Sequence, residues 1–182
     1  MVRKIFLIVV LFFLIVAISL GTNKFMNDMG LISSARVKMI PIKNTTMVLQ
    51  SGGRVIYVDP VGGAEVFKGL PAPDLILLTH NNPNHFDLKT LEAVSKKDTD
   101  IVAPVPMAYM FPDTVLGTLY VMKNGQKTIR QGIEIQAINV YGLSVSKGSY
   151  DKKIDGNGYV LDISGNTVNI SIDAGTQNLV VN

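Results

Sequence analysis

The sequence predicts a β-rich α/β domain preceded by an N-terminal hydrophobic helix, and three observations lead to this class. Short runs rich in β-branched and aromatic residues recur from residue 37 to residue 172, separated by Gly, Asn, Asp and Ser. One helical pattern, residues 88–96, follows an apolar run over residues 75–78. Residues 5–20 are apolar throughout except for Ser19.

The N-terminal run is typical of a targeting segment. Arg3 and Lys4 give it a positive start, and Ala17 and Ser19 suit a cleavage site, so residues 1–21 are a signal peptide or an uncleaved membrane anchor. We expect an exported protein, anchored on the extracytoplasmic or periplasmic side of a membrane, or secreted if the leader is cleaved. Residues 22–36 are a linker, and 37–182 form one domain.

Composition excludes several classes of function. The chain of 182 residues contains no cysteine, which excludes disulfides, thiolate metal sites and a cysteine nucleophile. Without Arg3 and Lys4 it carries 15 basic and 14 acidic residues, scattered along the chain. A domain so close to neutral has no electrostatic reason to bind nucleic acid.

The expected elements follow in order. A strand over 37–42 and another over 45–49 lead to a Ser-Gly-Gly turn, and the strand 54–58 returns and ends in Asp59-Pro60. After the helix, strands are expected at 101–103, 119–122, 133–141, 159–163 and 168–172, with a loop over 143–157. Asn124-Gly125 is the strongest hairpin signal.

Both histidines of the protein lie in one polar stretch, residues 79–87, between a buried strand and the helix. Neutral histidine is a common metal ligand and the usual proton carrier near neutral pH. Two histidines in a polar loop are also compatible with a loop that is merely solvated. Spacing alone leaves both interpretations open.

In combination, four motifs resemble the metallo-β-lactamase superfamily, in particular its small, lactonase-like metal-dependent hydrolases. The motifs, in chain order, are Val55-Ile56-Tyr57-Val58-Asp59-Pro60, Thr79-His80-Asn81-Asn82-Pro83-Asn84-His85, Val140-Tyr141-Gly142, and Gly158-Tyr159-Val160 followed by Ile172-Asp173-Ala174. The resemblance covers about residues 40–178. It implies an αβ/βα sandwich, here incomplete at the C-terminus, with up to two zinc ions at one edge.

The resemblance also assigns residues. His80 corresponds to the first metal ligand, Asn82 to the second, Asn84 to the motif aspartate, His85 to the third histidine and Asp173 to the carboxylate that bridges two metals. It thus implies metal binding by these five residues and catalysis by Asn84, His85 and Asp173. Asp59 corresponds to an aspartate that steadies the histidine loop. Asp151 is the nearest polar candidate for a further ligand that the chain lacks.

The departures from the motif bear on function. An asparagine offers only a neutral carbonyl oxygen, a poor zinc ligand beside imidazole or carboxylate. We therefore expect one weakly held zinc ion at most, and a degraded site with weak or no hydrolytic activity. The alternative is a functional single-zinc hydrolase of a small ester, lactone or phosphoester, and a purely structural envelope protein is a third class. Expected partners are a membrane, a small-molecule ligand and a protein covering the shortened C-terminal edge.

Overall fold

The computed structural model describes residues 36–181 with gaps at 44, 145–148, 154 and 174–175, and for 141–153 and 171–181 it describes the backbone alone. The expected targeting segment and all of the linker but Arg36 lie outside this part of the chain. Within it, no helix has the length and hydropathy needed to cross a membrane.

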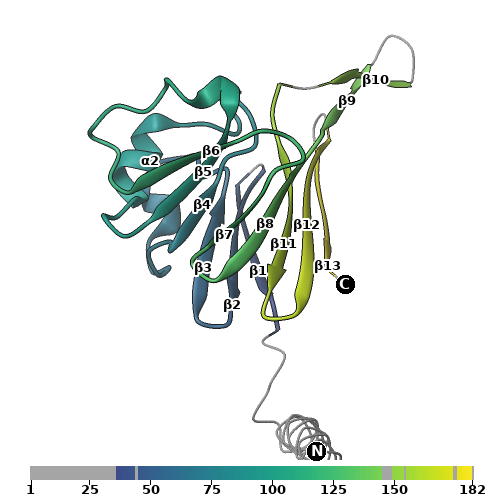
Figure 1. Cartoon of the computed structure of the whole chain (residues 1–182). Helices are drawn as coiled ribbons and strands as arrows, with labels where there is room; N and C mark the ends of the chain where they lie inside the picture. The colour runs from purple at the N-terminus through teal and green to yellow at the C-terminus, as the bar shows by residue number, and fades with distance from the viewer. Residues whose placement is uncertain (1–35, 44, 145–148, 154, 174–175, 182) are drawn as a thin grey trace, which may run out of the picture. The chain divides into compact units, whose positions relative to one another are not determined.

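The first sheet contains strands β1 to β6, in the order in which they occur along the chain (Figure 1). They are β1 (Lys38–Lys43), β2 (Thr46–Ser51), β3 (Arg54–Val58), β4 (Leu75–Leu77), β5 (Asp100–Pro104) and β6 (Thr118–Met122). Strands β1 to β3 are antiparallel, whereas β3 to β6 are parallel, so the sheet is mixed. Parallel strands need crossover connections, and the longest of these carries the helix α2 (Leu88–Val94).

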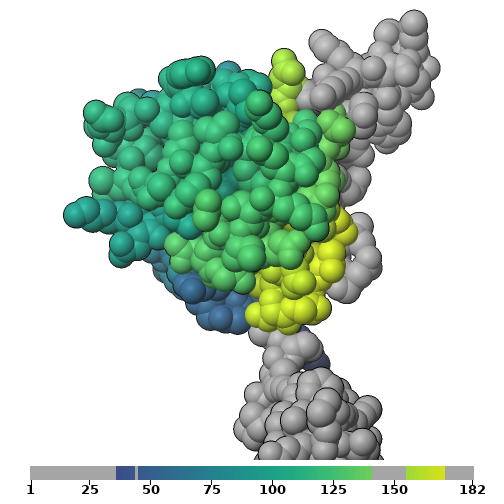
Figure 2. Space-filling view, in the orientation of Figure 1, coloured from purple at the N-terminus to yellow at the C-terminus, as the bar shows by residue number. Residues whose placement is uncertain are grey.

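The second sheet is antiparallel and has the order β13-β12-β11-β8-β7. Its strands are β7 (Lys127–Arg130), β8 (Ile133–Ile138), β11 (Gly158–Ile163), β12 (Asn166–Asp173) and β13 (Thr176–Val181). A separate two-stranded ribbon joins β9 (Tyr141–Ser144) to β10 (Ser149–Lys153). Figure 2 shows the green segment, which includes β6, β7 and β8, covering much of one face of the domain.

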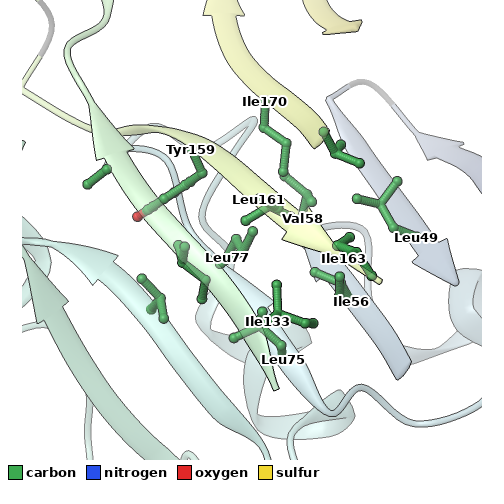
Figure 3. Packing of buried hydrophobic residues seen from close by; sticks show 14 of the residues in the cluster. Leu49, Ile56, Val58, Leu75, Leu77, Ile133, Tyr159, Leu161, Ile163 and Ile170 are labelled. Carbon is green, nitrogen blue, oxygen red and sulfur yellow. The ribbon is translucent and has the colours of Figure 1, made fainter. Parts of the chain in front are cut away.

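The two sheets face each other across the main core (Figure 3). Leu75 and Leu77 of the first sheet, for example, lie among Ile133, Leu161 and Ile170 of the second, all of them at most 2% exposed. The alternation expected from residue 133 onward is confirmed, because Ile133 and later odd-numbered residues of β8 are buried while Glu134 is exposed. A strand that buries one face in this way is fixed in register.

The opposite face of the first sheet packs against the helices. A second core cluster joins residues of β2 to β5 with Leu91 and Val94 of α2, Phe67 of the 3₁₀ helix η1 (Ala64–Phe67) and Met107 of η2 (Val105–Met107). The described residues therefore form three layers: helices, mixed sheet and antiparallel sheet. A β-rich α/β class is confirmed. No helix covers the outer face of the second sheet within the described part of the chain, and the partner expected at the C-terminal edge stays a prediction.

Two expectations were wrong. Asn124-Gly125 does form a turn, closed by the bond from the Gln126 N–H to the Lys123 carbonyl, but it does not close a hairpin. Strand β6 pairs with β5 and strand β7 with β8, so the turn carries the chain from one sheet to the other. The expected loop over 143–157 contains strand β10, which pairs with β9 although its sequence is polar.

Candidate metal and hydrolase site

The parallel pairing of β3 with β4 determines where the site lies. Val58 is opposite Leu77 in this pair, so the residues that follow both strands emerge at the same edge of the first sheet. Those residues are Asp59 on one side and Leu78, Thr79 and His80 on the other. The Asp59 N–H donates to the Leu77 carbonyl at 2.9 Å and continues the ladder to this point. Sites in sheets of this kind usually lie beyond the carboxyl ends of the strands.

Asp59 is fully buried and adopts a φ of 45°, a conformation that aspartate tolerates better than most residues. Its carboxylate accepts hydrogen bonds from the Thr79 N–H at 2.8 Å and from the Thr79 hydroxyl at 2.5 Å. It also bonds His85 Nδ1 at 2.7 Å. Burial raises the pKa of Asp59, while the bonds to His85 and Thr79 act in the opposite direction. The expected support of the histidine loop by Asp59 is confirmed.

The bond to Asp59 selects the tautomer of His85. A carboxylate can only accept, so Nδ1 of the ring carries the proton and Nε2 keeps its lone pair. His85 is only 7% exposed, so the pair is shielded from water. Histidines that ligate metals almost always have their second nitrogen held by a carboxylate or carbonyl in this way.

His80 lies beside His85, with ring centroids 4.1 Å apart and the planes tilted by 49°. Its side chain is half-buried, and its Nδ1 lies 3.3 Å from the Thr79 hydroxyl. Burial lowers the pKa of His80 to about 4, and a proton on His85 would act in the same direction. His80 is therefore neutral at pH 7, which is the form that binds a metal.

The two asparagines assigned to the metal site lie in the exposed middle of the loop. The Asn82 side-chain oxygen accepts the Asn84 N–H at 3.0 Å, and the Asn84 backbone carbonyl accepts the Thr45 hydroxyl at 2.9 Å. Asn82 thus uses the one atom that could bind a metal to close a local turn. The metal roles of Asn82 and Asn84 stay predictions.

Asp173, the residue assigned as the bridging carboxylate, ends strand β12, where its backbone pairs with Thr176. Its side chain, like that of Asp151, lies outside what the structure describes. Among the described side chains no group of three or more His, Cys, Asp or Glu is gathered for a metal ion. Asp59, the acid that contacts His85, is already bonded to Thr79 and His85.

The donor set can be tested against a metal. The bond of Nδ1 to Asp59 leaves Nε2 of His85 as the nitrogen with a lone pair, and His80 is neutral, so both fit as nitrogen ligands. Two ligands do not complete a site, since zinc in proteins takes three or four. The described residues therefore fit one half of a single-ion site, and the expected ligand role of Asp173 stays a prediction.

Sequence reasoning did not predict the role of Thr79 at the centre of this site. Its hydroxyl lies within hydrogen-bonding distance of Asp59 and 3.3 Å from Nδ1 of both histidines. Thr79 is fully buried, so this contact is made in a water-poor environment. The signal that could have revealed it is a polar residue placed directly after a buried strand.

A hollow of about 390 Å³ opens on the same edge of the domain. The chain following β5, the turn after β6 and the segment 155–157 line it, with Pro104 and Met122 on its apolar side. Gly156 of this lining pairs with His80 in an isolated antiparallel bridge. The volume lies in the range of small-molecule sites.

Comparisons with known proteins show which proteins this chain is similar to. A UPF0173 metal-dependent hydrolase of Lysinibacillus sphaericus (strain C3-41) is 36% identical over 64 residues, which are 33% of this chain and 28% of that protein. A metal-dependent hydrolase candidate from Parabacteroides distasonis ATCC 8503 has a similar solved structure, with a TM-score of 0.57 and 26% identity over 74% of this chain and 64% of that one. The chain thus spans less than two thirds of the length of either relative.

More distant structures share the fold. The metallo-β-lactamase fold protein YhfI of Bacillus subtilis aligns with a TM-score of 0.51 at 15% identity, over 69% of this chain and 53% of that one. A family model described as the beta-lactamase superfamily domain matches residues 41–171. Because this match covers most of the chain, the protein belongs to the beta-lactamase superfamily domain family, whose metallo-β-lactamase fold it shares.

Proposed function

We propose that this protein is a metal-dependent hydrolase that holds one divalent ion through His80 and His85 and acts on a small ester, lactone or phosphoester. The bond between Asp59 and His85 is the observation that supports this proposal best. It is buried, it fixes the tautomer, and it leaves Nε2 of His85 ready for an ion. Burying a carboxylate costs free energy, and the orientation of a metal ligand would explain why this loop bears that cost.

The residues of the chain have distinct tasks in this proposal. Asp59 orients His85, and Thr79 fixes Asp59 through its N–H and hydroxyl. His80 remains neutral and supplies the second nitrogen. A carboxylate from Asp173 would complete three ligands, which suits zinc. A metal in such a site lowers the pKa of a bound water and polarises a carbonyl or phosphoryl oxygen.

We propose one ion rather than two. A second dication would need the carboxylate that the family motif has at position 84 and the imidazole that it has at position 82. Asparagine supplies neither, and the Asn82 oxygen already accepts the Asn84 N–H. This same observation favours a second candidate function, a metal-binding module of the same fold that does not hydrolyse its ligand.

Elemental analysis of the full-length chain, purified without chelators, tests the proposal together with hydrolysis of an aryl ester, a γ-lactone and an aryl phosphodiester. We expect close to one zinc per chain and activity on one of these classes that a chelator removes. His85→Ala should lose both the zinc and the activity. Glu134→Gln, which changes an exposed carboxyl group on the second sheet, is the control and should keep both.

The outcomes separate the candidates. Bound zinc without hydrolysis of any of the three substrates would favour the binding module. Only trace metal in the wild-type protein, even after incubation with excess zinc, would overturn both. Hydrolysis that survives chelation and His85→Ala would mean that the activity belongs to another site or to a contaminant.

A further inference from the structure

One short segment of the second sheet, residues 156–159, contacts the start of the histidine loop at successive positions. The Asn157 N–H donates to the Thr79 carbonyl at 2.8 Å, and Gly156 pairs with His80. The Tyr159 hydroxyl donates to the Leu78 carbonyl at 2.7 Å. The carbonyls of Leu78 and Thr79, the two residues before His80, are therefore bonded from the opposite sheet, and Gly156 lies directly opposite His80.

The burial and protonation of Tyr159 suit it to donate this hydrogen bond. Its ring is fully buried in the main core, and Figure 3 shows its hydroxyl oxygen at the far end of the ring from β11. Burial raises the pKa of Tyr159, so the hydroxyl keeps the proton that it donates. The Asn157 side chain donates to the Met122 carbonyl at 3.0 Å and so ties the same segment to β6.

Gly156 adds a steric requirement. A Cβ at this position would lie 2.4 Å from the Thr79 carbonyl oxygen and 2.7 Å from the His80 Cβ, both far inside normal contact distance. The two backbones therefore approach each other as closely as they do only because residue 156 has no side chain.

The two histidines differ in how they are held. The ring of His85 is fixed by a 2.7 Å bond to a buried carboxylate. Among the described residues, the polar contact of the His80 ring is the long 3.3 Å approach of its Nδ1 to Thr79, beside its tilted contact with the His85 ring. The place of His80 must then depend chiefly on its backbone. We propose that Tyr159 and Gly156 are positioning residues that set the place of the His80 imidazole relative to His85.

This proposal rests on the proposed function only for its metal readout, because the position of an imidazole can be measured without a metal. The chain offers a matched control in Tyr57. This tyrosine is 1% exposed, and its hydroxyl donates to the Pro71 carbonyl at 2.8 Å, in the core cluster on the helix side of the first sheet. Tyr159→Phe and Tyr57→Phe thus each remove a hydrogen bond from a core tyrosine to a backbone carbonyl, which is buried at Tyr159 and partly buried at Tyr57.

The first measurement uses full-length protein, stripped of metal and isotopically labelled at histidine. The chain has two histidines, so variants of each assign the imidazole signals. We expect Tyr159→Phe to shift the ring signals of His80, and Tyr57→Phe to leave them in place although it lowers the melting temperature by a similar amount. Unchanged His80 signals in Tyr159→Phe, or equal shifts in both variants, would overturn the proposal.

The second measurement is zinc affinity, for which removal of a supporting contact typically costs about 10- to 100-fold. Tyr159→Phe should weaken zinc binding to this degree, and Tyr57→Phe should not. A wild-type protein that binds no zinc would refute the proposed function, while the imidazole signals would still decide the positioning role. Equal zinc affinity in Tyr159→Phe and the wild type would overturn the positioning role.

If Tyr159→Phe does not fold, 3-fluorotyrosine placed at position 159 or at position 57 gives the same comparison. Fluorination makes the hydroxyl a stronger donor and keeps the ring. Displaced His80 signals with the label at 159 alone support the proposal, and undisplaced signals overturn it.

Discussion

The two ends of the histidine loop are held in different ways. At the C-terminal end, a buried carboxylate from the neighbouring strand fixes the ring of His85 directly. At the N-terminal end, the carbonyls of Leu78 and Thr79, directly before His80, are bonded from the second sheet, while the His80 ring has only a long contact with the Thr79 hydroxyl and a tilted contact with the His85 ring among the described residues. The difference teaches that a ligand can be oriented through its ring or positioned through its main chain, and that this loop uses one means at each end.

The difference also separates orientation from placement. The bond to Asp59 decides which nitrogen of His85 is free, so a change there alters chemistry without moving the loop far. The contacts of residues 156–159 decide where His80 lies, so a change there moves the loop without altering a tautomer. Variants at the two ends should therefore fail differently.

The largest effect is expected at the carboxylate. Asp59→Asn keeps a residue that tolerates the positive φ of 45° and can still accept from Thr79. Its amide would donate toward His85 Nδ1 and favour the tautomer with the proton on Nε2, which cannot bind a metal. We expect zinc affinity to fall at least about 10- to 100-fold and stability to fall by about 1 to 3 kcal/mol, measured by zinc titration and urea unfolding.

Asp74→Asn is the matched control for Asp59. Asp74 accepts from the Val55 N–H at 2.8 Å and pairs with Arg54 at 3.2 Å, at the opposite edge of the same sheet. Its variant should lose stability but keep zinc. If the two variants bind zinc equally well, the carboxylate does not select the tautomer.

At the other end of the loop, Gly156→Ala should break the close approach to His80. The added Cβ would lie 2.4 Å from the backbone carbonyl oxygen of Thr79. A backbone atom cannot move away by a change of rotamer, as the end of a flexible side chain can. We expect a loss of about 1 to 3 kcal/mol in urea unfolding, together with weaker zinc binding. Gly53→Ala, at a turn with φ of 76° and open space around it, is the control that adds backbone strain without a steric clash, and it should keep zinc affinity. A Gly156→Ala protein as stable as the wild type would show that the segment is not tightly apposed.

A pH effect of intermediate size is expected from His80. The pKa of His80 is about 4 in the folded protein against an ordinary value of 6.5, so the unfolded chain takes up this proton first. The metal-free protein should therefore lose stability as the pH falls from about 6.5 to about 4, and the contribution should level off below that. The raised pKa of Asp59 acts in the opposite sense, since its folded form binds a proton more readily.

Comparing the wild type with His80→Gln isolates the contribution of His80, because Asp59 remains in both. Urea unfolding at pH 7, 5.5 and 4.5 should show a smaller loss of stability in the variant. Parallel curves for the two proteins would mean that His80 takes up its proton equally easily when folded and unfolded.

The parts of this fold that the sequence predicts are those encoded locally. Strand alternation after residue 133 and the strand that leads into Asp59 follow from patterns a few residues long. The motif around the loop suggested the role of Asp59, although 26 residues separate it from His85. The bond from Tyr159 to Leu78 spans 81 residues, and no local pattern encodes which carbonyl a buried hydroxyl will reach. The Asn124-Gly125 turn was misread because a turn signal does not specify which sheet the chain enters next.

The smallest effect is expected in the exposed middle of the loop, where Asn82 closes a turn with Asn84. Asn82→Ala should cost about 0.5 to 1.5 kcal/mol, because the Asn84 N–H loses its partner but can turn to water. Asn82→Asp keeps an acceptor and should restore the stability, and Asn81→Ala, at the exposed neighbour, is the control. If the Asn82 oxygen is a metal ligand rather than a turn-former, Asn82→Ala will instead lower zinc affinity without changing the unfolding of the metal-free protein. The metal would then be held by the middle of the loop as well as by its two ends.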